Sequence, residues 1–356
     1  MLSYDVVEWG KPLQLIERKT PNPNGTEVLV QLKYCGVCHS DVHIRDGYFD
    51  LGGSKQLHMT ERGMRLPATL GHEPFGTVVA AGPKAGNVAI GADRLVYPWT
   101  GCGECVRCEE GLDNYCMAAK MIGIQRRGGY ADHLIVPHPR YLIDASGVDP
   151  VWAATLSCSG LSTYSAVSKL KPIPREEWVA VMGAGGLGLS AIGMLRALGH
   201  ERIVAVDIDD AKLTAAMEAG SAATLKGCDN DAASKLKQIA NGMLYGAVDF
   251  VGSAETAKLA LSALRKGGKL ILVGLFGGEI SLSIAGTILR AITIQGSHVG
   301  SVDELKAVVA LAQQGKIRPI PFEKRPLSEV SRTLDELKVG SVVGRVVVEM
   351  PLPPGE

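Results

Sequence analysis

The sequence predicts an α/β protein with two domains, one rich in β-strands and one built around a doubly wound parallel sheet. The chain has 356 residues, enough for two domains at a typical size of about 150 residues each. Its first ~150 residues carry mainly strand patterns broken by Gly, Pro and Asp. From Trp178 onward, strand and helix patterns alternate, which predicts parallel strands covered by helices.

Hydrophobic periodicity justifies each element of this fold. In the first part we expect strands at residues 27–34, 76–82 and 93–99. In the second part we expect strands at 178–183, 202–207, 247–252 and 269–275, separated by helices at 187–199, 210–220 and 255–267. Near the C terminus we expect a helix around 302–315 and a strand at 344–350 that pairs back with the first domain.

Charge and composition exclude several function classes. The 37 basic and 37 acidic residues cancel, so the chain has no long-range field to hold nucleic acid or an anionic membrane. No apolar run approaches the roughly 18 residues of a membrane-spanning helix, and Asp5 and Glu8 occupy the region where a signal peptide is basic and then apolar. We therefore expect a cytoplasmic protein with a small-molecule ligand.

The eight cysteines would stay reduced in that compartment, so their spacing points to metal or catalytic chemistry. One short loop holds four of them in the pattern C-x2-C-x2-C-x7-C, which predicts a closed tetrahedral zinc site with a structural role. An iron–sulfur cluster is the alternative, but its usual bacterial pattern has three residues and a proline around the fourth cysteine. The predicted ligands are Cys102, Cys105, Cys108 and Cys116.

A second set of soft ligands is dispersed along the chain: Cys38, His72 and Cys158. Two thiolates and one imidazole would leave zinc a fourth position for water or substrate, as a catalytic site requires. Taken alone the set is ambiguous, because a cysteine in an apolar stretch is more often a small core residue. Cys35 and Cys228 have no partner at metal spacing, and we expect ordinary packed or exposed thiols there.

A glycine-rich loop follows the strand at 178–183 and opens the helix at 187–199, which is the arrangement of a Rossmann-type dinucleotide site. A glycine-rich packing turn between strand and helix is the structural alternative. Asp207 ends the next strand, where a carboxylate accepts from the ribose 2′-hydroxyl and repels a 2′-phosphate, which favours NAD over NADP. The loop residues are Gly183, Gly185, Gly186, Leu187 and Gly188.

The cysteine patterns followed by the glycine-rich loop, on one chain and in this order, resemble the zinc-containing alcohol dehydrogenases of the medium-chain dehydrogenase/reductase family. The resemblance covers nearly the whole chain. The resemblance implies a GroES-like catalytic domain at residues 1–159 and 297–356, and an NAD-binding Rossmann domain at 160–296. It also implies that Cys38, His72 and Cys158 hold a catalytic zinc, with Glu73 nearby, and that the four-cysteine loop holds a structural zinc.

The implied reaction is reversible hydride transfer between an alcohol and NAD, giving a ketone or aldehyde. Ser40 matches the hydroxyl beside the substrate oxygen in this family, and His43 matches the imidazole that passes the proton toward water. His39 and Arg345 match basic residues on the cofactor pyrophosphate, and we also expect cofactor contacts from Lys212 and Val273. The alternatives are a polyol dehydrogenase or other zinc-dependent member, a zinc-free quinone or enoyl reductase, and a nucleotide-binding regulatory protein without turnover.

Two departures from the family concern the substrate and the assembly. The connection at 48–67 is long and could form a wall of the substrate pocket. Only 11 residues separate Cys116 from Gly128, which favours the tetrameric microbial type, with a dimer as the alternative. Ser40 is small, so we expect a roomy pocket for medium-sized secondary, cyclic or aromatic alcohols. The expected apolar walls are Phe49, Tyr97 and Trp99.

Overall fold

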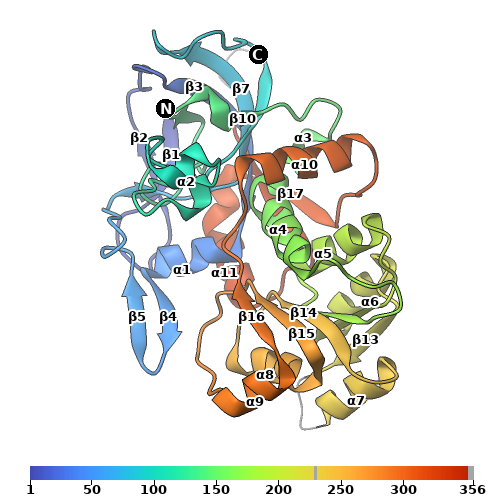
Figure 1. Cartoon of the computed structure of the whole chain (residues 1–356). Coiled ribbons are helices and arrows are strands. Elements are labelled where there is room, and N and C mark those ends of the chain that lie inside the picture. The colour runs from blue at the N-terminus through green and yellow to red at the C-terminus, as the bar shows by residue number, and fades with distance from the viewer. Residues whose placement is uncertain (228–230, 352–356) are drawn as a thin grey trace.

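Two large sheets organise the computed structural model, which describes residues 1–227 and 231–351. In Figure 1 the N-terminal strands occupy the upper left, while the yellow and orange strands and helices of the second sheet lie at the lower right. The long helical segment that includes α4 (Leu161–Leu170) runs between them.

The first sheet has seven strands, and the C-terminal strand β18 (Arg345–Glu349) lies inside it, antiparallel to β3 (Val28–Val37). The predicted return of the C terminus to the first domain is thus confirmed. The strand order is β10 (Leu142–Ile143), β8 (Asp93–Val96), β7 (Pro74–Ala81), β3, β18 and β17 (Phe322–Pro326), and β9 (His133–Val136) also pairs with β3. A smaller sheet joins β1 (Leu2–Val6), β2 (Gln14–Glu17) and β6 (Ala68–Thr69).

The second sheet has six strands, all parallel to their neighbours. Their order is β13 (Ala223–Lys226), β12 (Ile203–Asp207), β11 (Val179–Met182), β14 (Leu244–Asp249), β15 (Leu264–Leu272) and β16 (Thr293–Gly296). Relative to chain order this is 3-2-1-4-5-6, the dinucleotide-binding arrangement. The direction in which successive strands are added to the sheet therefore reverses between β11 and β14, and such sheets bind ligands there, at the carboxyl ends of their strands.

Helices cover this sheet and join it to the first one. Those of the second sheet are α5 (Gly186–Ala197), α6 (Asp210–Glu218), α7 (Ala232–Ile239), α8 (Ala254–Ala263) and α9 (Ile284–Arg290). Around the first sheet lie α1 (His39–Asp46), α2 (Val106–Glu109), η1 (Asp113–Tyr115), η2 (Pro139–Tyr141), α3 (Pro150–Thr155), η3 (Leu156–Gly160), α10 (Val302–Gln313), η4 (Leu327–Glu329) and α11 (Val330–Lys338). The α3, η3 and α4 segments follow one another without a break, and η3 is a π-helical turn.

The long connection at 48–67 contains a β-hairpin formed by β4 (Tyr48–Gly52) and β5 (Lys55–His58), which protrudes at the lower left of Figure 1. Its tip touches the loop after β15. A Cβ atom added at Gly52 would lie 2.8 Å from the carbonyl carbon of Gly278, and one added at Gly277 would lie 2.7 Å from Cβ of Asp50. The hairpin therefore bridges the two sheet-based halves of the molecule.

The predicted strands and helices are present, with ends that differ by a few residues. The sequence analysis did not identify β13, α7, α9, β16 or the hairpin. Strands β13 and β16 have only four residues each, and α9 buries none of its side chains. These three elements therefore lack the periodic apolar signal. Across residues 1–227 and 231–351, no helix is both long and apolar enough to cross a membrane.

Candidate active site

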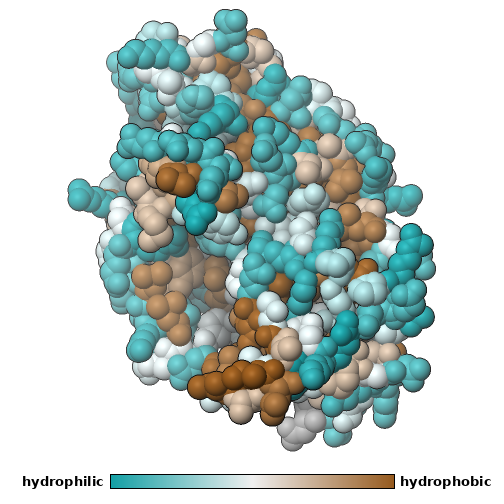
Figure 2. All heavy atoms as spheres, viewed as in Figure 1, coloured by the Kyte–Doolittle hydropathy of each residue, from teal (hydrophilic) through white to brown (hydrophobic). Residues whose placement is uncertain are grey.

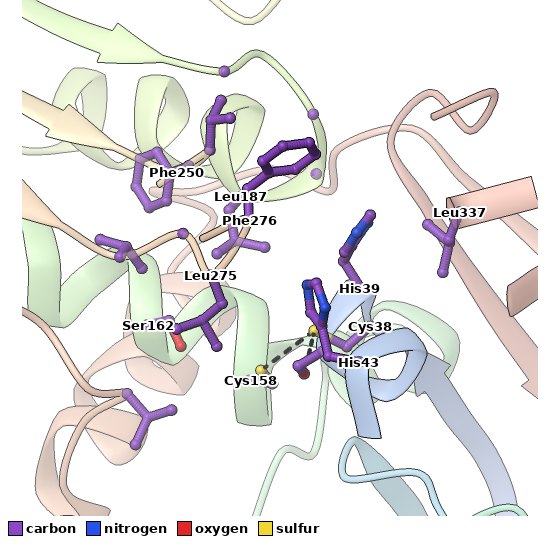
Figure 3. Close-up of a pocket in the computed structure, with 18 of the residues that line it drawn as sticks. Cys38, His39, His43, Cys158, Ser162, Leu187, Phe250, Leu275, Phe276 and Leu337 are labelled. Carbon is purple, nitrogen blue, oxygen red and sulfur yellow. Dashed lines mark hydrogen bonds between the residues drawn. The ribbon is translucent and has the colours of Figure 1, made fainter. Parts of the chain in front are cut away.

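A cavity of about 880 Å³ lies at the switch point of the parallel sheet, between its carboxyl edge and the first sheet. Gly183 after β11 and Phe250 after β14 line one side of it, and Cys38 and Cys158 line the other. Figure 3 shows the two thiols and His43 facing Leu187, Phe250 and Phe276 across the cavity. One cavity is therefore lined by residues of the dispersed ligand set and by the glycine-rich loop.

The dispersed metal ligands come together at the floor of this cavity. Cys38 precedes α1, His72 follows β6, and Cys158 lies on the π-helical turn η3. Their ligand atoms and a Glu73 carboxylate oxygen all lie within 4.8 Å of one another. The Sγ atoms of Cys38 and Cys158 are 4.0 Å apart, close to the separation of about 3.8 Å that two thiolates at 2.3 Å from a tetrahedral zinc would have.

The thiol pair is electrostatically polarised even before metal binding. The sulfur–sulfur hydrogen bond lowers the pKa of Cys38 well below its ordinary value and raises that of Cys158, since one negative charge is favoured and a second is not. A divalent cation would remove this conflict by accepting both thiolates. The chemistry and spacing of the donor set therefore fit zinc.

Asp41 orients the imidazole of His72, a role that the sequence analysis did not assign. Its Oδ1 lies 3.0 Å from Nδ1 of His72, which leaves Nε2 free to face the thiols. Burial opposes protonation of this histidine, but the Asp41 carboxylate outweighs it and raises the pKa of His72. Oδ2 of Asp41 accepts from the Tyr130 hydroxyl at 2.7 Å and from the Cys38 backbone N–H at 3.1 Å. One carboxylate thus fixes two of the ligand-bearing segments.

Glu73 lies behind the three ligands and does not line the cavity. Its Oε1 accepts from the backbone N–H of Ser159 at 3.3 Å, and its Oε2 forms a buried ion pair with Arg345. Burial raises the pKa of Glu73 to about 7 despite the opposing charge of Arg345. Gly36 makes room for this carboxylate, because a Cβ atom there would lie 1.8 Å from Oε2.

Ser40 and His43 lie on α1 beside the ligands, and both line the cavity. The Ser40 hydroxyl is 3.2 Å from Sγ of Cys38 and 3.4 Å from Nε2 of His72. The His43 ring packs at a tilted angle against two other rings, those of His39, at a centroid distance of 5.3 Å, and Phe49, at 5.5 Å. Burial and the neighbouring His39 lower the pKa of His43, so a neutral imidazole able to accept a proton is favoured near pH 7.

The four-cysteine loop forms a second metal-ligating cluster away from the cavity. The Sγ of Cys105 lies 3.6 Å from that of Cys108 and 3.7 Å from that of Cys116, while those of Cys102 and Cys108 are 3.9 Å apart. These separations again match the edge of a tetrahedral zinc–thiolate site. Four sulfur ligands leave no position for substrate, which fits a structural role. Cys35 is buried outside both clusters, and Cys228 lies outside the described residues.

The glycine-rich loop has the backbone geometry that its glycines predict. Gly183 has φ +87°, and a Cβ at Gly188 would lie 1.8 Å from the Gly183 carbonyl oxygen. A Cβ at Gly186 would meet the Arg345 side chain at 2.5 Å, whereas one at Gly185 would meet nothing within 4 Å. Open space therefore adjoins the N-terminus of α5, where a pyrophosphate could accept backbone N–H groups.

Asp207 ends β12 at the rim of this loop and lines the cavity. Its carboxylate accepts from the backbone N–H groups of Ala184 and Ile208, both at 2.7 Å. The other residues expected to contact a cofactor also line the cavity: His39, Leu187, Lys212, Val273 and Arg345. Residues from five segments of the chain that are expected to bind the dinucleotide therefore line one cavity.

The predicted pocket walls are corrected at one position. Trp99 and Phe49 line the cavity, and the Trp99 ring lies 5.3 Å from that of His72. Tyr97 does not line it. Its ring stacks on Tyr141 in the core, because its hydroxyl finds a buried partner in the carbonyl of Gly300 at 2.7 Å. Strand alternation would place Tyr97 and Trp99 on the same face, but β8 ends at Val96, so this alternation does not extend to either residue.

The sequence analysis missed several further wall residues, which lie far apart in the sequence and carry no motif. They include Arg62, Tyr115, Met121, Ile124 and His298.

Comparison with known proteins supports this assembly of motifs. Residues 24–146 match the alcohol dehydrogenase GroES-like domain, and residues 186–314 match the zinc-binding dehydrogenase domain. The chain is 34% identical to an NAD-dependent alcohol dehydrogenase of Sulfurisphaera tokodaii over 349 residues, covering 98% of this chain and 99% of that protein.

Two solved structures illustrate the range of relatives. D-arabinose dehydrogenase from Sulfolobus solfataricus has a TM-score of 0.82 and 29% identity, with 98% of each chain covered. Acetophenone reductase from Geotrichum candidum, solved in complex with NAD, has a TM-score of 0.84 and 28% identity, with 98% of this chain and 96% of that one covered. With two family domains, a full-length relative and this fold, the chain belongs to the zinc-containing alcohol dehydrogenase family, with its GroES-like and Rossmann-type domains.

Proposed function

We propose that this protein is an NAD-dependent alcohol dehydrogenase that transfers hydride reversibly between an alcohol and NAD, giving a ketone or aldehyde. The main observation behind this proposal is that a Cys–His–Cys set with the spacing of zinc ligands and a loop of the dinucleotide-binding type line one cavity. In this arrangement a bound zinc would supply Lewis acidity for the alcohol oxygen, and bound NAD would supply the hydride acceptor. The full-length relative named as an NAD-dependent alcohol dehydrogenase supports the same conclusion.

Cys38, His72 and Cys158 would hold the catalytic zinc, with Glu73 behind them. Ser40 would accept the alcohol proton, because its hydroxyl lies beside two of the ligand atoms and faces the cavity. His43 would then carry that proton toward solvent, since its neutral imidazole lies on the next turn of α1. These two residues hold and move a proton, and the apolar walls exclude water.

The open backbone at Gly185 would receive the pyrophosphate, with His39, Lys212 and Arg345 as its basic neighbours and Val273 beside the nicotinamide half. Asp207 would accept from the ribose 2′-hydroxyl and repel a 2′-phosphate, which favours NAD. We assign residues 1–159 and 297–356 to the catalytic domain and 160–296 to the coenzyme domain. The six-stranded parallel sheet ends at Gly296, which supports the second boundary.

We infer two zinc ions per chain, because two separate ligand clusters have the spacing of tetrahedral sites. Metal analysis of the purified protein tests this count. About two zinc ions per chain are expected, and a value near one in fully active enzyme would contradict the assignment of one cluster.

The substrate is proposed to be a medium-sized secondary, cyclic or aromatic alcohol, since the cavity is large and Trp99 and Phe49 supply aromatic walls. A polyol substrate is the alternative, and the similarity to a D-arabinose dehydrogenase supports this alternative. Initial rates of NAD reduction with ethanol, cyclohexanol, benzyl alcohol and sorbitol separate these classes. A higher kcat/KM for ethanol than for the larger alcohols would contradict the roomy pocket, and Trp99→Ala should change the ranking.

We propose that the protein is a cytoplasmic homo-oligomer, with the tetramer expected and a dimer as its smaller form. The zinc-ligating thiols need a reducing compartment. The edge strand β16 carries mostly exposed residues and has β15 on one side only, which leaves its other edge open to a second copy. Beside it, α9 exposes Ile284, Ile288 and Leu289, which form part of the brown patch at the lower edge of Figure 2.

Light scattering of the purified protein tests this assembly. Ile288→Glu places a charge on the α9 face and should lower the measured mass toward that of one chain. Ile90→Glu is the matched control, because Ile90 is an exposed isoleucine in the connection between β7 and β8 of the first sheet, which does not include α9. A monomeric wild-type protein, or an oligomer that Ile288→Glu leaves intact, would contradict this interface.

A further inference from the structure

Four basic side chains line the cavity, and three of them have partners within the protein. Lys212 donates to the carbonyl of Gly340 at 3.0 Å, Lys338 forms an ion pair with Asp46 at 2.6 Å, and Arg345 pairs with Glu73. Among the residues that the structure describes, the fourth, Arg62, has no side-chain hydrogen bond and no carboxylate partner. Its one side-chain contact of note is with Phe49.

Arg62 lies at the substrate end of the cavity. Its guanidinium carbon is 5.6 Å from the centroid of the Phe49 ring, and that ring contacts His43 on the helix that begins at Cys38. His298 also lines the cavity and contacts Trp99 at a centroid distance of 6.1 Å, and the Trp99 ring contacts the proposed zinc ligand His72. Burial lowers the pKa of His298 and the charge of Arg62 lowers it further, so Arg62 lies near His298 as well as near Phe49.

The electrostatic setting of Arg62 is unfavourable without a ligand. The side chain is half-buried, and burial alone lowers its pKa, with no carboxylate acting in the other direction. Asp207 is the one carboxylate among the described lining residues, and it lies at the glycine-rich loop with its oxygens bound to backbone N–H groups. A cation that is desolvated and unpaired beside a reaction site is costly unless a ligand neutralises it.

The geometry of the guanidinium indicates the class of ligand. A guanidinium near an aromatic face keeps the N–H groups of its outer edge available for hydrogen bonds in its own plane. That planar fork matches the two oxygens of a carboxylate or phosphate, whereas a neutral hydroxyl would use one donor and leave the charge unpaired. The aromatic rings of Phe49 and Trp99 would contact the apolar body between the reacting carbon and the anion.

We propose that the physiological substrate is an alcohol or ketone that carries an anionic group, a carboxylate or a phosphate, at the end remote from the reacting carbon, and that Arg62 binds this group. This inference rests on the proposed alcohol dehydrogenase activity and narrows its substrate class. Arg62 is then a specificity-determining residue. It binds substrate, while the zinc ligands, Ser40 and His43 keep their roles for neutral alcohols as well.

Matched alcohols test the inference directly. Benzyl alcohol, 4-(hydroxymethyl)benzoate and 4-(hydroxymethyl)phenyl phosphate share one reacting group and one ring, and they differ in the remote substituent. Initial rates of NAD reduction by the zinc-loaded enzyme give kcat/KM for each. We expect at least one anionic alcohol to exceed benzyl alcohol by about ten- to hundredfold, the scale of a charge-assisted bidentate contact, mainly through a lower KM. The two anionic probes distinguish a carboxylate from a phosphate.

Arg62→Gln should remove that preference, so the ratio of kcat/KM for the anionic alcohol to kcat/KM for benzyl alcohol should fall toward one. Arg62→Lys, which keeps the charge but not the planar fork, should retain part of the preference. Arg65→Gln is the matched control, because Arg65 is exposed, lies three residues away and does not line the cavity. Thermal unfolding should show that Arg62→Gln folds normally.

The outcomes separate this inference from the proposed function. If wild-type enzyme oxidises benzyl alcohol but neither anionic probe is preferred, or if Arg62→Gln leaves the preference intact, the anionic substrate class is overturned while the dehydrogenase activity stands. If neither benzyl alcohol nor any other tested alcohol reduces NAD, the proposed function itself has failed.

Discussion

Single side chains in this site act on several neighbours at once. Asp41 contacts the His72 imidazole, the Tyr130 hydroxyl and the Cys38 backbone, so it positions two segments that carry proposed zinc ligands with one carboxylate. Glu73 is similarly shared between Arg345 and the backbone N–H of Ser159, next to Cys158. The ligand geometry therefore depends on buried carboxylates that do not bind the substrate.

Cofactor choice should depend on the Asp207 carboxylate. Asp207→Ser removes a charge-assisted acceptor from the ribose and relieves repulsion of a 2′-phosphate, so the NAD over NADP preference should fall by ~1–3 kcal/mol. The ratio of kcat/KM for the two cofactors measures this change. Asp210→Ser is a control that removes a nearby exposed carboxylate, paired with Lys226, and should leave the ratio unchanged. A wild-type preference for NADP would contradict the assignment.

Proton transfer through His43 should appear in the pH profile. Burial lowers the pKa of His43 below the ordinary histidine pKa of about 6.5. Its neutral form, which accepts protons, is therefore the main form at pH 6.5 and above. His43→Gln should slow alcohol oxidation most at low pH, where solvent base is scarce, and rates should recover partly as pH rises. His58→Gln, on the exposed hairpin, is the control. An equal loss at every pH would indicate a positioning role instead.

The sequence could predict these residues to different extents. Cys102 to Cys116 and the glycine-rich loop are local patterns, so spacing alone identified them. Cys38, His72 and Cys158 became interpretable only through the family resemblance, because 120 positions separate the first from the last. Arg62 and His298 could not be found, since their proximity arises only when the hairpin connection and the segment after β16 fold together.

At the level of elements, the π-helical turn η3 sets the position of Cys158. It interrupts the helical path between α3 and α4, and π-turns of this kind are frequent at functional sites. Hydrogen bonds from Ser159 to Thr155 and from Ser157 to Ala154 hold the turn. Periodicity predicted no such turn, because every residue of η3 is buried and the segment therefore has no alternation of apolar and polar faces.

The four-cysteine loop should be separable from catalysis. Cys105→Ser replaces a thiolate by a poor zinc ligand, so the protein should lose one zinc per chain and unfold at a lower temperature. Alcohol oxidation per folded molecule should persist, because none of the four cysteines lines the cavity. Val106→Ser, at the exposed neighbouring position, is the control. One lost zinc with unchanged thermal stability would contradict a structural role for this site.

The contact between the β4–β5 hairpin and the loop after β15 should control access of the alcohol to the cavity between the two halves of the molecule. Gly277→Ala would place its Cβ 2.7 Å from Asp50, so the hairpin or the loop must move apart, at a cost of ~1–3 kcal/mol. We expect KM for the alcohol to rise about tenfold. Gly278→Ala is the matched control, because its φ is also positive at +101° but the nearest atom to its Cβ is 3.6 Å away. Equal KM values in the two variants would show that the contact has no role.

For the whole molecule, the architecture was predictable because each sheet has a strong local signal. Alternating strands and helices after Trp178 predicted the parallel sheet, and β18 was expected to return to the first one. The position of Tyr97 could not be predicted, because its buried hydroxyl bonds to Gly300, 203 positions away along the chain. Contacts between distant segments, rather than periodicity, decide which aromatic residues face the substrate.

The most direct test of the proposed zinc-dependent alcohol oxidation is the initial rate of NADH formation by wild-type protein and Cys158→Ala. Without the full ligand set, no group in the cavity can supply the same stabilisation of negative charge on the substrate oxygen, which is worth several kcal/mol. We predict at least a ~1000-fold slower rate for Cys158→Ala with benzyl alcohol, corresponding to about 4 kcal/mol. Wild-type turnover in Cys158→Ala would contradict the proposed zinc-dependent mechanism.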